Sequence, residues 1–258
     1  MTPKPSLSSW ISTPRPNPAS RLRLFCFPYA GGGASIFYTW PGTLPPDVEL
    51  CPVQLPGREA RLAEPPYRDM MELVARLGEV LEPHMDRPFA FFGHSNGAIM
   101  SFELARLLRR QGRRMPLHLF LSGRAAPHVP LSHPPVHELP EPAFSDALRR
   151  LQGTPEEILA NAEIMALITP LLRADFSLAE TYACAPEEPL DVPVTAYGGD
   201  ADPDVTPEDV EGWSRYTRAD FDSRIFPGGH FFLNTQRAMV LAELARNLAA
   251  VTARAARA

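Results

Sequence analysis

The chain has 258 residues, of which 45% are hydrophobic and 21% charged, and these ordinary globular proportions exclude a disordered chain and a coiled coil. Its formal net charge of -5 offers no basic surface for nucleic acid, and no apolar run is long enough to span a membrane. The three cysteines contain no Cys-x-x-Cys pair, which disfavours a disulfide framework or a zinc site and makes the cytoplasm the expected compartment.

The first segment, residues 1–20, is rich in Pro and Ser and contains no apolar core of signal-peptide length. We expect it to be a loosely ordered tail. Residues 21–258 are expected to form one domain.

Short apolar runs then alternate with segments of helical periodicity, a pattern typical of a mostly parallel sheet covered by helices. The strands are predicted at 22–27, 48–54, 89–92, 117–121, 192–197 and 223–226. Helices are predicted at 69–81 and 96–110, near 207–213, and in a long C-terminal segment capped by Asn234.

The alternation stops between residues 127 and 189, where no convincing strand is found. Thr154 and Glu157 have the spacing of a capping box, which predicts a helix running toward Thr169. Pro170 is expected to interrupt that helix, and a second helix is predicted at 171–182. We interpret 127–189 as a helical insertion that covers the site as a lid.

The strongest local motif is Gly93-His94-Ser95-Asn96-Gly97, which lies between a predicted strand and a predicted helix. This is the setting of a nucleophile elbow, where a tight turn exposes a strained serine at the carboxyl end of a strand. The alternative is a plain strand-to-helix turn that happens to contain a serine.

An acid and a histidine follow Ser95 in the order that this fold requires. Asp200 and Asp202 both follow a predicted strand, and Asp202 is favoured because it lies three residues past Gly199 and just before a proline. Asp200 would then be a turn residue or a hydrogen-bonding partner. His230 follows the last strand and is the expected general base, which Asp202 would orient.

A glycine-rich loop, residues 28–33, follows the first predicted strand. Such a loop can direct a backbone N–H at a developing oxyanion, and we expect donors from Ala30 and Asn96. A phosphate-binding loop is disfavoured because neither G-x-G-x-x-G nor a P-loop lysine is present.

These residues predict a serine hydrolase of the α/β-hydrolase fold with Ser95, Asp202 and His230 as its triad. The other histidines, His94 included, are expected to be structural, surface or lid residues. A non-catalytic binding protein of the same fold is disfavoured because no triad member is missing.

Several segments beyond the elbow are similar to those of one family, from about residue 24 to about residue 233. They are FPYAGGGAS at 27–35, QLPGREAR at 54–61, FGHSNGA at 92–98, SGRAAP at 122–127, LRADF at 172–176 and PGGHFFL at 227–233. The chain resembles the discrete type II thioesterases that accompany polyketide synthases and nonribosomal peptide synthetases.

That resemblance implies that Ser95 attacks an acyl thioester on the phosphopantetheine arm of a carrier protein, and that the enzyme removes stalled acyl groups. It also implies that no metal or soluble cofactor is needed. Phe176 is expected to form part of the acyl chamber wall or to pack within the lid. Arg58 and Arg61 are expected to support a loop, to meet an acidic carrier protein, or to form solvated salt bridges. A monomer in the cytoplasm is the expected form.

Two residues depart from the family pattern beside the expected oxyanion hole. The family usually has His at the position of Tyr29 and a hydrophobic residue such as Met at that of Asn96, so both are expected to affect substrate binding. The triad alone leaves open a general carboxylesterase for small-molecule esters. A cyclising terminal thioesterase is a further alternative.

Overall fold

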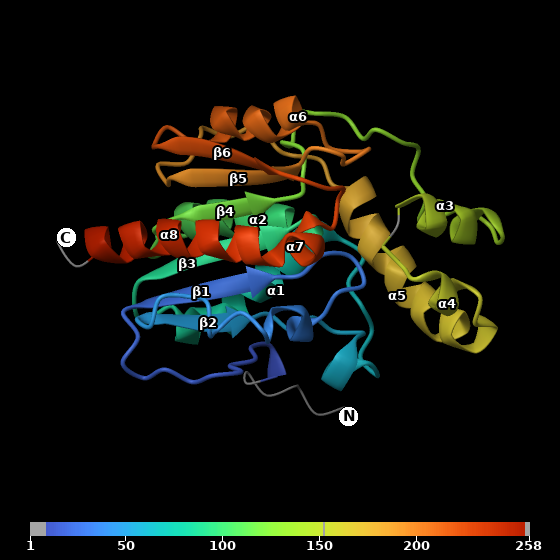
Figure 1. The fold of residues 1–258 in the computed structure, drawn as a ribbon, viewed down its shortest axis with the longest axis horizontal. Helices are drawn as coiled ribbons and strands as arrows, with labels where there is room; N and C mark the ends of the chain where they lie inside the picture. Colours follow the sequence, from blue (N-terminus) through green and yellow to red (C-terminus); the bar gives the residue numbers. More distant parts are fainter. Residues whose placement is uncertain (1–8, 152, 256–258) are drawn as a thin grey trace.

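The computed structural model describes residues 9–151 and 153–255, and its centre is one six-stranded sheet in the order β2-β1-β3-β4-β5-β6 (Figure 1). Every neighbouring pair of strands is parallel, as the α/β pattern predicted. The strands are β1 (Leu22–Phe27), β2 (Val48–Pro52), β3 (Phe89–His94), β4 (Leu119–Ser122), β5 (Val194–Gly199) and β6 (Phe221–Phe226).

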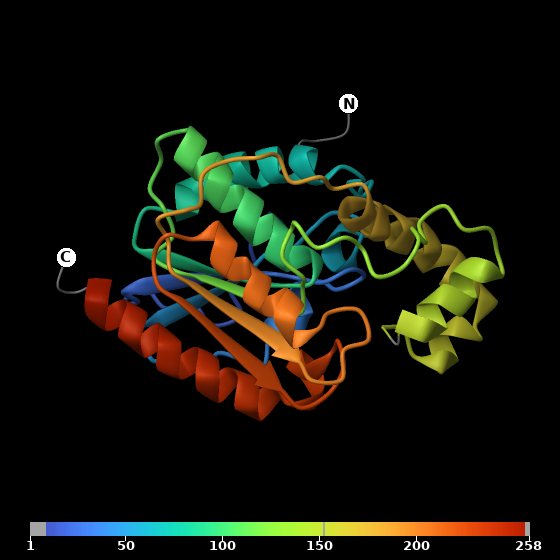
Figure 2. The same ribbon diagram turned by 90° about the horizontal axis from the view of Figure 1, so that it is seen from above.

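Both faces of the sheet are buried, which explains why its central strands are apolar at nearly every position. In β1, Phe25 and Phe27 belong to the core on one face, whereas Leu24 and Cys26 belong to the core on the other. Figure 2 shows α1 and α2 covering the first face and α8 covering the second. The helices of the body are α1 (Met70–Leu81), α2 (Asn96–Arg110), α6 (Pro207–Glu211), α7 (Phe232–Thr235) and α8 (Arg237–Ala255).

Local signals account for several helix ends. Asp69 caps α1 by accepting a hydrogen bond from the Glu72 N–H at 2.8 Å. Gly112, with φ +62°, lies just beyond the end of α2, as the sequence predicted. The C-terminal helix differs from its prediction, because Asn234 lies inside the short helix α7 and α8 begins only at Arg237.

The segment between β4 and β5 holds three helices and no strand among its described residues. The helices are α3 (Ala143–Leu151), α4 (Glu156–Leu159) and α5 (Ala162–Glu180), and they lie beyond the carboxyl ends of the strands (Figure 1). They have a small core of their own, which includes Phe144, Leu148 and Leu159. We call these three helices the lid.

The helix boundaries in the lid differ from those predicted. No capping box forms at Thr154, because Pro155 is the N-cap residue of α4 and makes no side-chain cap. The Asn161 side chain instead starts a new helix, accepting from the N–H groups of Glu163 and Ile164. This helix, α5, runs through Pro170 without ending, since Pro170 is exposed and so is Ala166, whose carbonyl loses its usual partner in the helix.

The N-terminal segment also differs from its prediction where it is described, while residues 1–8 lie outside the described residues. Trp10 is 2% exposed, and the Arg61 guanidinium lies 4.0 Å from its ring centroid. The Trp10 carbonyl accepts from the Gln54 N–H, and the Ser12 N–H donates to the Pro52 carbonyl. Residues 10–12 are thus bonded to the end of β2 and the residues just after it, and Trp10 completes the core on that side.

Among the described residues, no helix combines the length and the apolar character that crossing a bilayer requires.

Replacing Trp10 should therefore destabilise the whole domain. We expect Trp10→Ala to lower the free energy of unfolding by about 3–5 kcal/mol, because it empties a buried indole site. Trp10→Phe should cost less, since it retains the ring and removes an indole N–H that has no partner among the described residues. Urea denaturation of the three proteins measures both effects. A Trp10→Ala protein as stable as wild type would contradict the assignment of Trp10 to the core.

Candidate active site

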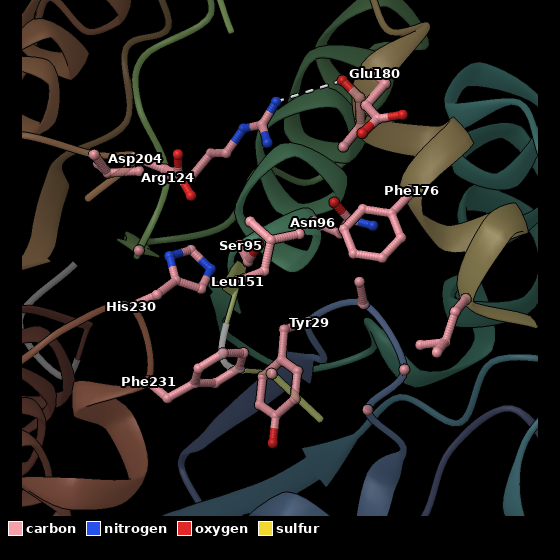
Figure 3. Close-up of a pocket in the computed structure, with 18 of the residues that line it drawn as sticks. Tyr29, Ser95, Asn96, Arg124, Leu151, Phe176, Glu180, Asp204, His230 and Phe231 are labelled. Atoms are coloured by element: carbon pink, nitrogen blue, oxygen red, sulfur yellow. Dashed lines mark hydrogen bonds between the residues drawn. The ribbon is translucent and has the colours of Figure 1, made fainter. Parts of the chain in front are cut away.

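A cavity of about 1000 Å³ opens between the carboxyl ends of the strands and the lid. Ser95 and His230 line it from the body, and Phe176 lines it from α5 (Figure 3). Much of its wall is aliphatic, with contributions from Leu148, Leu151, Ile158, Ile164, Ile168, Leu171 and Leu172. This is the form expected of a site for an apolar ligand.

Ser95 occupies the turn between β3 and α2 with φ +55° and ψ -115°, a strained conformation for a residue with a side chain. The motif glycines make that turn possible. A Cβ on Gly93 would lie 1.9 Å from the Gly97 carbonyl oxygen, and a Cβ on Gly97 would lie 2.1 Å from the Phe27 carbonyl oxygen. The elbow context inferred from the sequence is thus present, with β1, β3 and α2 in close contact around the serine.

Asp202, and not Asp200, is hydrogen-bonded to the histidine. The Asp202 Oδ2 atom lies 2.7 Å from Nδ1 of His230, and its Oδ1 atom accepts from the Asp204 N–H. Asp200 follows the same strand but accepts from the Gly228 N–H at 2.8 Å, which fastens the loop that carries the histidine. Asp200 thus makes a hydrogen bond between the two loops, in keeping with the role expected of it if Asp202 is the acid.

Ser95 and His230 face the same cavity, but no hydrogen bond joins their side chains in the structure of the described residues. With Nδ1 of His230 bonded to Asp202, the neutral ring keeps Nε2 free to accept a proton. Serine–histidine contacts are often long without substrate and tighten when it binds. The arrangement can therefore deliver a proton acceptor to the serine.

His94 is fully buried, and its ring bridges two groups behind the site. Its Nδ1 lies 2.8 Å from Ser122 Oγ, and its Nε2 lies 3.0 Å from the His230 carbonyl oxygen. Burial lowers its pKa well below the usual value, so the ring is neutral. In that state Nε2–H donates to the His230 carbonyl and Nδ1 accepts from Ser122. The structural role expected of His94 is thus to hold the histidine backbone.

The glycine-rich loop after β1 borders the cavity beside Ser95. Within the part of the chain that is described, the N–H groups of Ala30 and Asn96 donate to no protein acceptor, and both residues line the cavity. Tyr29 packs edge-on against Phe231, with ring centroids 5.2 Å apart (Figure 3). Phe176 lines the cavity and also packs against Phe144 of the lid. It is therefore part of the cavity wall and of the lid packing at the same time.

Arg58 and Arg61 are both 4% exposed, so loop support is the only one of their three expected roles that fits. Arg58 forms a bidentate ion pair with Asp175 of α5, in which its two terminal nitrogens lie 2.7 and 2.9 Å from the carboxylate oxygens. The sequence reasoning missed Asp175, although it lies in the LRADF segment that the resemblance had singled out. Nothing local could have revealed its partner, which is 117 residues away.

No group of three or more His, Cys, Asp or Glu side chains with the geometry of a metal site occurs among the described residues.

The profile of the thioesterase domain family matches residues 22–250. The gramicidin S biosynthesis protein GrsT of Aneurinibacillus migulanus is 43% identical over 247 residues, which cover 96% of each chain. The thioesterase RedJ from the prodiginine pathway of Streptomyces coelicolor superposes with a TM-score of 0.83 at 43% identity, covering 88% of this chain and 91% of RedJ.

A second solved structure, the type II thioesterase BorB from the borrelidin biosynthetic cluster, superposes with a TM-score of 0.84 at 37% identity. The superposition covers 93% of this chain and 98% of BorB. The elbow, the aspartate–histidine pair and the helical lid thus occur on a chain that matches this family over almost its whole length. The chain belongs to the thioesterase domain family.

Proposed function

We propose that this protein is a serine thioesterase that hydrolyses acyl groups from the phosphopantetheine arm of carrier proteins. The observation that carries the proposal is the placement of Ser95 on a strained elbow, facing the same cavity as the hydrogen-bonded His230–Asp202 pair. Membership of the thioesterase domain family supports the thioester as the bond that is broken.

In the first half-reaction the Ser95 hydroxyl attacks the thioester carbonyl while His230 takes its proton. The negative charge that develops on the carbonyl oxygen is received by the N–H groups of Ala30 and Asn96, which are unpartnered in the described structure. The intermediate collapses, the C–S bond breaks, and the protonated His230 returns the proton to the pantetheine thiol. Asp202 fixes the imidazole tautomer and stabilises its cationic form.

In the second half-reaction His230 activates a water molecule, which attacks the acyl-serine ester and releases a free carboxylic acid. Ser95 recovers its proton from His230. These two steps balance without a redox group or a metal, so we propose that no cofactor is required. The pantetheine arm enters as part of the substrate.

The names of similar proteins support a carrier protein of a biosynthetic assembly line as the partner. GrsT is named for gramicidin S biosynthesis, RedJ for the prodiginine pathway and BorB for the borrelidin cluster. We therefore propose that the carrier proteins belong to a polyketide synthase or nonribosomal peptide synthetase, and that the enzyme proofreads it by removing stalled acyl groups. The proposed compartment is the cytoplasm, where thiols such as that of the pantetheine arm stay reduced.

The acyl preference should follow from the aliphatic wall of the cavity. Each additional CH₂ buried there contributes at most about 0.8 kcal/mol, so kcat/KM should rise up to about fourfold per carbon from acetyl toward octanoyl carrier thioesters. A chain-length series at subsaturating substrate measures this slope. Equal rates for acetyl and octanoyl groups would show that the lid cavity does not hold the acyl chain.

The two neighbouring aspartates offer a matched comparison. Asp202→Asn should lower kcat by about 10²–10⁴-fold, because the amide favours the wrong histidine tautomer. Asp200→Asn retains the oxygen that accepts from the Gly228 N–H and should change kcat less than about threefold. Steady-state hydrolysis of one acyl-carrier thioester compares them. The opposite ranking would make Asp200 the triad acid.

The substrate class is tested with a panel of acylated carrier proteins and a panel of simple esters, using wild type and Ser95→Ala side by side. Wild type should release acyl groups from carriers, and Ser95→Ala should not exceed the background. Turnover of simple esters without release from any carrier would replace the proposal with a general carboxylesterase.

A further inference from the structure

Asp175 of the lid helix α5 contacts both segments that supply the proposed oxyanion donors. Its carboxylate is bonded to the loop after β1, which carries Ala30, and its main-chain carbonyl is bonded to Asn96 of the elbow. Asp175 is 1% exposed, so the side of each contact that it supplies is buried. The inference drawn from them rests on the proposed function, because it concerns the stabilisation of the acyl-transfer intermediate.

The carboxylate contact fixes the loop. Asp175 Oδ2 accepts from the Gly31 N–H at 2.7 Å, and this occupies the N–H next to that of Ala30. Arg58 donates to both carboxylate oxygens and also to the Gly32 carbonyl at 3.2 Å. The loop is therefore held on each side of Gly31, and the negative charge of the carboxylate is balanced by Arg58 rather than left beside a developing oxyanion.

Direct packing adds to these bonds. Gly31 has φ +76°, and a Cβ at that position would lie 2.9 Å from a methyl group of Leu172 in α5. The lid helix thus packs against the loop, where the positive φ of Gly31 favours glycine and an added Cβ would displace the Leu172 side chain. Movement of α5 away from the body would break this contact together with the Asp175 bonds.

The carbonyl contact fixes the elbow. Asn96 Nδ2 donates to the Asp175 carbonyl oxygen at 2.7 Å, and Asn96 is 2% exposed. Figure 3 shows the Asn96 side chain between Ser95 and Phe176 of α5. This bond joins the lid helix directly to the residue that follows Ser95.

We propose that Asp175 is a positioning residue that couples closure of the lid to completion of the oxyanion hole, with Asn96 and Arg58 as its partners. When α5 lies against the body, the two N–H donors on separate segments are held at a fixed separation. When α5 moves away, both segments lose their support at once. The site is then competent for acyl transfer only with the lid closed.

Asn96→Leu is the primary test, because it retains the backbone N–H and approximate side-chain size but removes the bond to Asp175. We expect kcat for an acyl-carrier thioester to fall about 10-fold or more with KM changed less than about threefold, since the loss is felt in the transition state. Ser177→Ala is the matched control. Ser177 Oγ donates to the Arg68 carbonyl at 2.7 Å, so this variant removes a bond between α5 and the body that does not involve either donor segment.

An alkyl boronic acid provides a second readout, because it adds to Ser95 and places a negatively charged oxygen in the hole. Its affinity, measured by calorimetry, should fall in Asn96→Leu by about the same factor as kcat/KM and should stay unchanged in Ser177→Ala. Asp175→Asn should also lower both quantities, because it weakens the hold on Gly31 while the main-chain carbonyl that accepts from Asn96 is retained. Should that variant fail to fold because Arg58 is left unpaired, the Asn96→Leu comparison decides alone.

Equal boronate affinity and equal kcat in wild type and Asn96→Leu would overturn the coupling. So would equal losses in Asn96→Leu and Ser177→Ala, because the lid bond would then act only through stability. If wild type hydrolyses no acyl-carrier thioester, the proposed function fails, and the boronate affinities still decide whether Asp175 and Asn96 position the hole.

Discussion

The close approach of backbone at Gly93 and Gly97 is the constraint on which the rest of the site depends. It holds Ser95 at φ +55°, a conformation that costs about 1–3 kcal/mol and persists only because β1, β3 and α2 surround it. Those elements are themselves fixed by two apolar cores, one on each face of a sheet whose central strands are buried. The strain at one serine is thus supported by the cooperative packing of the whole body.

A second set of close backbone contacts holds His230 and Asp202 in place. A Cβ on Gly199 would lie 2.4 Å from the Gly228 carbonyl oxygen, so the loops after β5 and β6 are pressed together. Asp202 and His230 meet there, while His94 holds the His230 backbone from the elbow side. The lid then acts on the other side of Ser95 through Asp175. A buried ion pair is weak evidence of stability, and its better-supported contribution here is to fix one arrangement of lid, loop and elbow.

Sequence patterns predicted the parts of this structure that are encoded locally. The helix Asn96–Arg110 and the strand Leu22–Phe27 have the predicted bounds, because glycine signals define the helix and a run that is apolar apart from Arg23 defines the strand. The lid helices do not have their predicted bounds. Asn161 starts α5 inside a segment that was predicted as one continuous helix, and α5 continues through Pro170, which lies on an exposed face. Trp10 and Asp175 were missed for a different reason. Their partners lie far away in sequence, and no local pattern identifies a contact that only tertiary packing creates.

The central claim is that Ser95 carries the acyl group between the carrier thiol and water. Rapid mixing of equimolar enzyme and acylated carrier protein, followed by acid quenching and intact-mass and peptide-mass analysis, measures this directly. The account predicts that free carrier thiol forms before free acid, with the acyl mass added transiently to the peptide that contains Ser95. Simultaneous appearance of thiol and acid under conditions that slow water attack, with no acyl-enzyme on that peptide at any time, would contradict it.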